Sequence, residues 1–101
     1  MNTDKLTTKA QEALREAQRL AEERRHGEVD TVHLVLALVR QAGGVVPSVL
    51  EKIGVKADLF GDVLDRQLRS RPQVEGEGLQ RGGSRDLQTT IEAAAKLAAQ
   101  M

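Results

Sequence analysis

The first apolar pattern in the chain recurs at intervals of three and four residues, which is the spacing of one helical face. It runs through Leu6, Ala10, Ala13, Leu14, Ala17, Leu20 and Ala21. Thr7 or Thr8 can cap the start of this helix, and Gly27 supplies a left-handed residue to end it. The mixed-charge segment 22–28 is typical of a solvated helix end.

A second helix is predicted from Asp30, a favourable N-cap, to about Gln41. Apolar residues lie on nearly every side of this segment, so we expect it at the centre of the fold. Two glycines at 43 and 44 end it. A short third helix follows, with Pro47 in its first turn and Gly54 at its end.

The remaining segments also have helical spacing. A fourth helix is predicted over residues 57–69, before Pro72, with these side chains facing inward: Leu59, Phe60, Val63, Leu64 and Leu68. Residues 73–83 are rich in glycine and predict a loop or linker. Ser84 then caps a fifth helix, whose inward face is Leu87, Ile91, Ala94, Leu97 and Ala98. No segment alternates as a strand would, so we expect an all-α fold.

The fifth helix repeats the pattern of the first after a shift of 77 residues, which places Thr7 on Ser84 and Leu14 on Ile91. This offset indicates a complete four-helix repeat at 1–72, a linker at 73–83 and the first helix of a second repeat at 84–101. The second repeat is incomplete in this chain. We therefore expect the chain to be less stable than a longer version, or to self-associate through its fifth helix.

Composition excludes several classes of partner. Fifteen Lys and Arg balance fifteen Asp and Glu, so the chain has no cationic excess for nucleic acid or for an anionic membrane. Phe60 is the single aromatic residue, which argues against base stacking. There is no cysteine and no apolar run of about 18 residues. We expect a soluble, cytoplasmic chain that binds neither nucleic acid nor membrane.

Candidate reactive groups are few. His33 lies in an apolar run at about the third position of the second helix, where it can hydrogen-bond the local backbone, so its predicted role is structural. A metal site would need more ligands than His33 and His26 provide. The glycines at 82 and 83 form no Walker motif. We therefore assign no catalytic or metal residue and no cofactor, and do not expect an enzyme.

Several motifs resemble one known family. Residues 7–14, TTKAQEAL, and 33–38, HLVLAL, are similar to the first two helices of the Clp N domain. The segments QAGGVVPSVLEKIGV and LRSRPQVEGEG resemble the ClpB-type AAA+ disaggregases in particular. This resemblance implies a Clp N-type helical bundle of two four-helix repeats. Its last three helices and the ATPase modules, which would bind ATP and Mg²⁺, would then lie outside this chain.

The resemblance also implies a function. Domains of this family engage unfolded or aggregated proteins and help to transfer them to the ATPase ring, which is a homohexamer. The family's apolar groove lies near the starts of the first and fifth helices, where Thr7 and Ser84 match capping positions. The predicted substrate-protein contacts are therefore Thr7, Leu14, Ser84, Leu87 and Ile91.

Two alternatives remain open. The chain could be the regulatory domain of a ClpA- or ClpC-type unfoldase that docks a folded adaptor for a protease. The PQVEG segment at 72–76 weighs against this reading. The chain could also be a freestanding helical oligomerisation module, which would form a symmetric dimer that buries the fifth helix of both copies.

Overall fold

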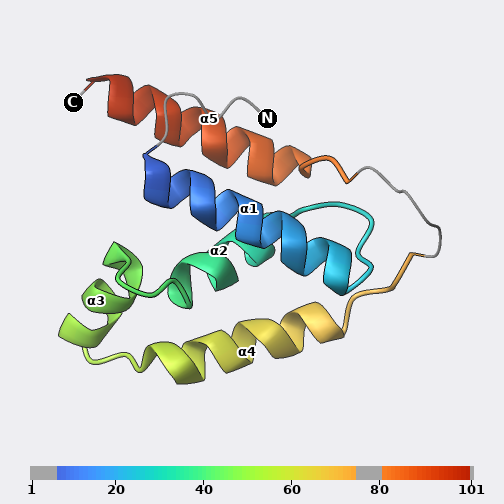
Figure 1. Cartoon of the computed structure of the whole chain (residues 1–101), viewed down its shortest axis with the longest axis horizontal. Coiled ribbons are helices and arrows are strands. Elements are labelled where there is room, and N and C mark those ends of the chain that lie inside the picture. Colours follow the sequence, from blue (N-terminus) through green and yellow to red (C-terminus); the bar gives the residue numbers. More distant parts are fainter. Residues whose placement is uncertain (1–6, 75–80, 101) are drawn as a thin grey trace.

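The computed structural model describes residues 7–74 and 81–100, with side chains as far as residue 97. These residues form five helices: α1 (Thr8–Glu23), α2 (Thr31–Val39), α3 (Val45–Lys52), α4 (Ala57–Arg69) and α5 (Arg85–Gln100) (Figure 1). Within those ranges no strand forms, and a single isolated bridge pairs Val29 with Gly83. The predicted all-α class is confirmed.

Helix α1 begins as predicted and ends earlier. The Thr7 hydroxyl accepts a hydrogen bond from the Ala10 amide at 3.2 Å. At the other end Arg25, with φ of 57°, is the left-handed residue, and the His26 amide donates to the Ala21 carbonyl at 2.9 Å. The prediction that Gly27 ends the helix was wrong, because this closing turn is complete before residue 27.

Helix α2 is the centre of the bundle, as its composition predicted. It ends at Val39, two residues before the expected Gln41. It packs against α1, α3, α4 and α5, and Leu36 at its middle is fully buried. The bundle is therefore organised around one short apolar helix.

Helices α3 and α4 are joined by a tight turn in which Gly54 has φ of 84°. The Val55 amide donates to the Leu50 carbonyl at 2.8 Å, which closes the end of α3. Helix α4 has the predicted bounds and buries Leu64 and Leu68. Leu59 and Val63 were predicted to face inward and are exposed instead. They lie on the side of α4 opposite the buried side chains, because each residue turns the helix by about 100°.

Among the described side chains of helix α5, those in its first half are the ones that pack against the bundle. The Ser84 hydroxyl accepts a hydrogen bond from the Leu87 amide at 3.1 Å, which confirms the predicted cap. Leu87 and Ile91 are buried, whereas Ala94 and Leu97, predicted to face inward, are exposed. Among the described helices the backbone of α5 comes close only to α2, and none of these helices covers its later turns. Ala98 lies outside the described side chains.

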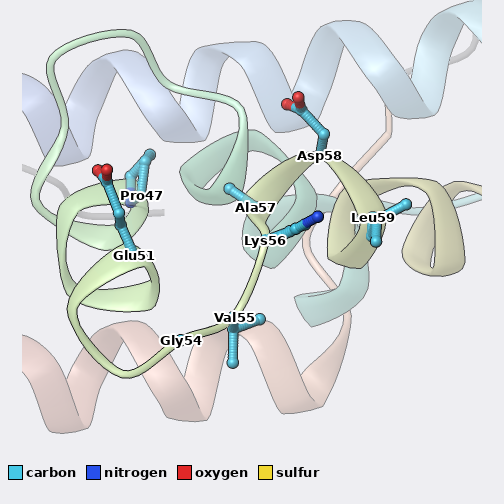
Figure 2. A pocket seen from close by; sticks show the side chains of 8 residues that line it. All are labelled: Pro47, Glu51, Gly54, Val55, Lys56, Ala57, Asp58 and Leu59. Atoms are coloured by element: carbon cyan, nitrogen blue, oxygen red, sulfur yellow. The ribbon is translucent and has the colours of Figure 1, made fainter.

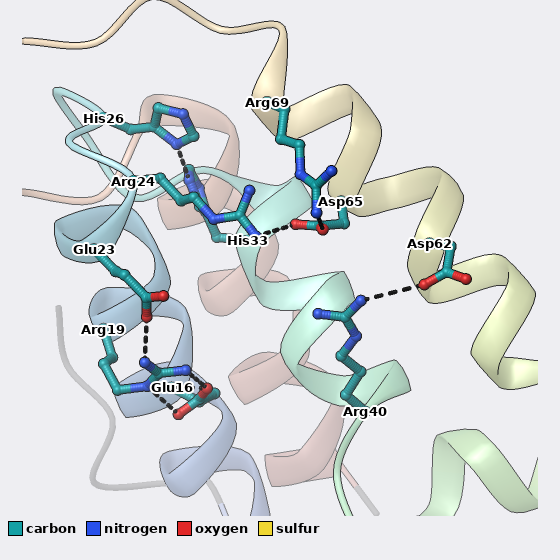
Figure 3. Close-up of polar contacts among 10 residues, drawn as sticks. All are labelled: Glu16, Arg19, Glu23, Arg24, His26, His33, Arg40, Asp62, Asp65 and Arg69. Carbon is teal, nitrogen blue, oxygen red and sulfur yellow. Dashed lines mark hydrogen bonds and ion pairs between the residues drawn. The ribbon is translucent and has the colours of Figure 1, made fainter.

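One apolar core joins the first four helices to the start of α5. Its buried members are Ala13, Leu14, Ala17, Leu20, Ala21, Val29, Leu36, Ala37, Val39, Leu64, Leu68, Leu87 and Ile91. Asp65 of α4 pairs with Arg24 at the end of α1 and, at 2.9 Å, with Arg69 (Figure 3). In the part of the chain that the structure describes, no helix is long and apolar enough to cross a bilayer. The predicted linker and repeat boundaries at residues 72 and 83 stay predictions.

Candidate functional site

Two features of the described structure could carry function: a buried polar cluster between the helices and an exposed apolar stripe on α3. The polar cluster, which we call the histidine cluster, consists of His26, His33, Asp30, Arg71 and Ser84. Its members come from the α1–α2 loop, the start of α2, the segment after α4 and the start of α5. It therefore joins four parts of the fold that are far apart in sequence.

The two histidine rings contact each other directly (Figure 3). The distance from His26 Nδ1 to His33 Nε2 is 2.8 Å, and both side chains are buried. The Asp30 backbone amide donates to His33 Nδ1 at 2.9 Å, so the proton of neutral His33 must lie on Nε2. His33 Nε2 then donates to His26 Nδ1, and the proton of His26 lies on its own Nε2. The bonds fix one tautomer for each ring.

This environment favours the neutral form of both rings. Burial, the neighbouring His26 and the Arg71 cation lower the pKa of His33 to about 4. Burial and then Arg71 also lower the pKa of His26. The prediction that His33 is structural agrees with its bond to the Asp30 backbone. The prediction that residues 22–28 are solvated was wrong for His26, whose side chain is buried.

Asp30 connects the histidines to α5. One carboxylate oxygen accepts from the Thr31 amide and from the Ser84 hydroxyl, both at 2.7 Å, and the other accepts from Arg71 at 2.8 Å. Burial alone would raise the pKa of Asp30, but the bonds from Ser84 and Arg71 hold it below the usual value. A single carboxylate thus caps α2 and receives the hydroxyl that caps α5.

Backbone contacts strengthen the same junction. The Val29 amide donates to the Gly82 carbonyl at 3.0 Å, and the Ser84 amide donates to the Val29 carbonyl at 2.7 Å. The Arg81 guanidinium donates to the His26 carbonyl. Among the described residues no three His, Asp or Glu side chains are grouped as metal ligands. The chemistry of this cluster is hydrogen bonding and proton binding.

The predicted client-contact residues occupy different places in the fold. Leu14, Leu87 and Ile91 all lie in the core, with Leu87 fully buried, and present almost no surface. Thr7 is exposed at the start of α1, whereas Ser84 is buried at the start of α5. Helices α1 and α5 run in opposite directions, so their starts lie at opposite ends of the molecule (Figure 1). The structure joins the three apolar residues in one core and keeps the two caps apart.

Exposed apolar side chains lie on α3, in addition to those on α4 and α5. Val45 and Val49 of α3 and the C-cap residue Ile53 are 77%, 48% and 66% exposed, and their four-residue spacing aligns them along one side of the helix. We call these three residues the α3 stripe. No residue of α3 is buried, although the helix contains five apolar side chains including Pro47. The spacing was visible in the sequence, but it does not indicate which side of a short helix is covered.

A hollow of about 560 Å³ lies beside α3, where the chain turns into α4. Figure 2 shows Pro47 and Glu51 of α3 on one side of it and Leu59 of α4 on the other. Pro47 and Glu51 lie two residues after Val45 and Val49, which is about 200° around the helix. The hollow and the α3 stripe therefore flank α3 on different sides and are separate surfaces.

Comparison with known proteins identifies a family and several relatives that the chain matches. Residues 5–101 match the family described as the Clp repeat (R) N-terminal domain. The chain is 47% identical over 78 residues to the chaperone protein ClpB of Nitratidesulfovibrio vulgaris, which covers 77% of this chain and 9% of the relative. It is 34% identical over 83 residues to ClpB of Clostridium tetani, covering 82% of this chain and 10% of the relative.

A third relative, also a ClpB chaperone, matches over more of the chain. The chain is 37% identical over 92 residues to ClpB of Rhodopirellula baltica, which covers 91% of this chain and 10% of the relative. The chain thus spans about a tenth of the length of the relatives it matches. Its five helices, central α2 and matched residues agree with one assignment: the chain belongs to the Clp N-terminal domain family and resembles the N-terminal domain of ClpB chaperones.

Proposed function

We propose that this chain is a client-recognition domain of an ATP-dependent chaperone, which binds unfolded or aggregated polypeptides and aids their transfer to an ATPase ring. Its similarity to proteins named ClpB supports a chaperone role. The observation that carries client binding is the exposed α3 stripe. An apolar surface with no fixed hydrogen-bonding groups can bind extended polypeptide segments of many different sequences.

The size of the α3 stripe favours weak binding. The exposed fractions of its three side chains add up to about two fully exposed side chains. Covering that surface with a client contributes about 3–6 kcal/mol to the free energy of binding. Association costs at least about 4 kcal/mol in lost freedom of motion, so a single contact leaves little net affinity. Weak binding suits a domain that must release its client. Several copies in one ring would raise the affinity through avidity.

The proposal also covers the longer protein of which this domain would be a part. ATP and Mg²⁺ would bind to ATPase modules of a longer cytoplasmic protein, assembled as a homohexamer. The predicted contacts Leu14, Leu87 and Ile91, with the caps Thr7 and Ser84, stay a second candidate for client binding. Because the three apolar side chains are buried, this surface requires α5 to leave its place.

Binding of a permanently unfolded polypeptide tests the proposal. Reduced, carboxymethylated α-lactalbumin would be titrated into the chain displayed on a multivalent support, so that weak affinity is measurable. Val49→Ser with Ile53→Ser should weaken binding at least about fivefold, since about 1 kcal/mol of apolar contact is lost. The matched control is Val63→Ser on α4, because Val63 is 49% exposed and Val49 is 48% exposed.

The outcomes separate the candidate functions. Equal binding by the α3 variant and the Val63→Ser control contradicts the role of the α3 stripe. Failure of the unmodified chain to bind any unfolded polypeptide contradicts client recognition itself. A single folded partner with fixed stoichiometry would instead indicate adaptor docking.

A further inference from the structure

We propose that His26, His33, Asp30 and Ser84 form a proton-sensitive clasp that holds α5 against the first four helices, and that proton uptake at His33 releases α5. The four residues are linked in series by hydrogen bonds of 2.7–2.9 Å. One end of the series is the loop after α1 and the other is the cap of α5. The release of α5 is a conformational change that the proposed function does not itself require.

Helix α5 has few other attachments to the residues that the structure describes. Its apolar contacts come from Leu87 and Ile91 in the first two turns, and the described residues after Ile91 are exposed or at most half-buried. The segment leading into it is held by the Val29–Gly83 bridge and by Arg81 on the His26 carbonyl. Both contacts are made to residues adjacent to the histidine cluster. A disturbance there therefore acts directly on the anchoring of α5.

An additional proton does not fit the clasp. His33 accepts at Nδ1 and donates from Nε2, and His26 accepts at Nδ1, so neither of the ring nitrogens that would gain a proton is free. Protonating His33 at Nδ1 would set two N–H groups against each other, at His33 and at the Asp30 amide. Protonating His26 at Nδ1 would do the same between the two rings. The proton can enter only if a bond of the series breaks.

The cations around the pair also oppose protonation. His26 faces the Arg24, Arg71 and Arg81 cations, and His33 faces His26 and Arg71. Among the described residues, Asp30 is the carboxylate that faces His33, and it acts against the cations by raising the pKa of His33. Its oxygens already accept from Arg71, Ser84 and the Thr31 amide. The closed cluster therefore excludes the proton, whereas an opened cluster exposed to water binds it near neutral pH. Falling pH shifts the balance toward the open form.

Release of α5 would uncover an apolar surface. Leu87 and Ile91 would leave the core, and the core side chains beneath them would become accessible. These two residues are among the predicted client contacts, so the clasp would control access to that second surface. This functional consequence rests on the proposed function, whereas the clasp itself does not.

Amide hydrogen exchange of the whole 101-residue chain tests the clasp. Protection factors of α5, corrected for the intrinsic pH dependence of exchange, would be compared at pH 7.5 and pH 5.0. If opening restores His33 to its ordinary pKa, the opening of α5 should increase by up to about 30-fold over this range. Amides in the middle of α1 and α2 should change far less. Equal protection of α5 at both pH values overturns the proposal.

His33→Gln is the matched variant. Glutamine is an ordinary residue at this capping position, since its amide oxygen can accept from the Asp30 amide and its NH₂ group can donate to His26. It does not titrate, so the change in α5 protection between pH 7.5 and pH 5.0 should fall to less than about threefold. An undiminished change in this variant would place the proton elsewhere and overturn the proposal.

Ser84→Ala tests the link from the other end. Removing the hydroxyl cuts the connection to Asp30, so α5 should already exchange faster at pH 7.5 and should respond less to acid. An Ser84→Ala chain that keeps both the protection and the pH response of the unmodified chain contradicts the clasp. Neither readout involves a client, so failure of the clasp and failure of client binding are distinguishable.

Discussion

Two single residues occupy positions where the backbone favours another residue type. Arg25 has a left-handed φ of 57° at the end of α1, a position that usually holds glycine. His33 takes the place of Glu or Gln in the capping box at the start of α2. Arg25 lies just after α1, and His33, a member of the histidine cluster, lies in the first turn of α2. Each leads to a measurable consequence for stability.

Arg25→Gly should stabilise the chain by about 0.5–1 kcal/mol, because glycine adopts this backbone conformation without steric cost. Urea unfolding followed by circular dichroism would measure the change. Arg25→Ala is the control, since it removes the same side chain but keeps a Cβ at positive φ. A gain of equal size in both variants would trace the effect to the side chain and contradict the backbone explanation.

Acid should destabilise the chain through His33. The unfolded chain binds a proton at this residue near pH 6.5, whereas the folded chain binds it only near pH 4. The free energy of unfolding should therefore be highest above pH 6.5 and should fall as the pH drops toward 4, by at most about 3 kcal/mol. Urea unfolding at pH 7.5 and 4.5 would measure it, and His33→Gln should lose less stability than the unmodified chain. A steeper loss in His33→Gln contradicts this assignment.

Among the helices, α2 is the one against which all the others pack. It contacts all four other helices, and Leu36 is fully buried at its middle. By contrast, α3 buries none of its side chains completely, and α5 is held through its first two turns. The contribution of a leucine to stability should therefore depend on the helix that carries it.

Leu36→Ala should lower the free energy of unfolding by about 2–5 kcal/mol, since it leaves a cavity where α2 meets its neighbours. Leu97→Ala on α5 makes the same chemical change at an exposed position and should cost less than about 0.5 kcal/mol. Thermal and urea unfolding of both variants would measure the difference. Similar losses in the two variants would show that α2 is not the centre of the core.

The sequence predicted the existence of the helices better than their buried faces. The bounds of α4 were correct because Pro72 and the spacing of Leu64 and Leu68 are local signals. The exposure of Leu59 and Leu97 was not predicted, because an apolar side chain looks the same in sequence whether or not another helix covers it. For the same reason the α3 stripe was read only as part of a short helix.

The histidine cluster could not be predicted from the sequence for a different reason. Its cap at Asp30 and the bond from His33 to the local backbone are within three residues and were expected. The contact between His26 and His33 depends on how the α1–α2 loop closes. The bond between Ser84 and Asp30 joins residues 54 positions apart. No local pattern specifies such a pairing.

At the scale of the whole molecule, the two candidate features lie far apart. Helix α3 is at one end of the bundle, and the end of α1, the end of α4 and the start of α5 meet at the other (Figure 1). The first end carries the exposed apolar stripe and the second carries the buried polar cluster. Client contact at α3 should therefore not require α5 to move, whereas the second predicted surface should.

The most direct test of the account is a map of where an unfolded polypeptide touches the folded chain. Amide chemical shifts of the ¹⁵N-labelled chain would be followed at pH 7.5 while reduced, carboxymethylated α-lactalbumin is added. We expect the perturbed amides to centre on residues 45–53 and α5 to stay in place. Perturbations centred on α1 and α5 with α3 unchanged, or no perturbation at millimolar polypeptide, would contradict it.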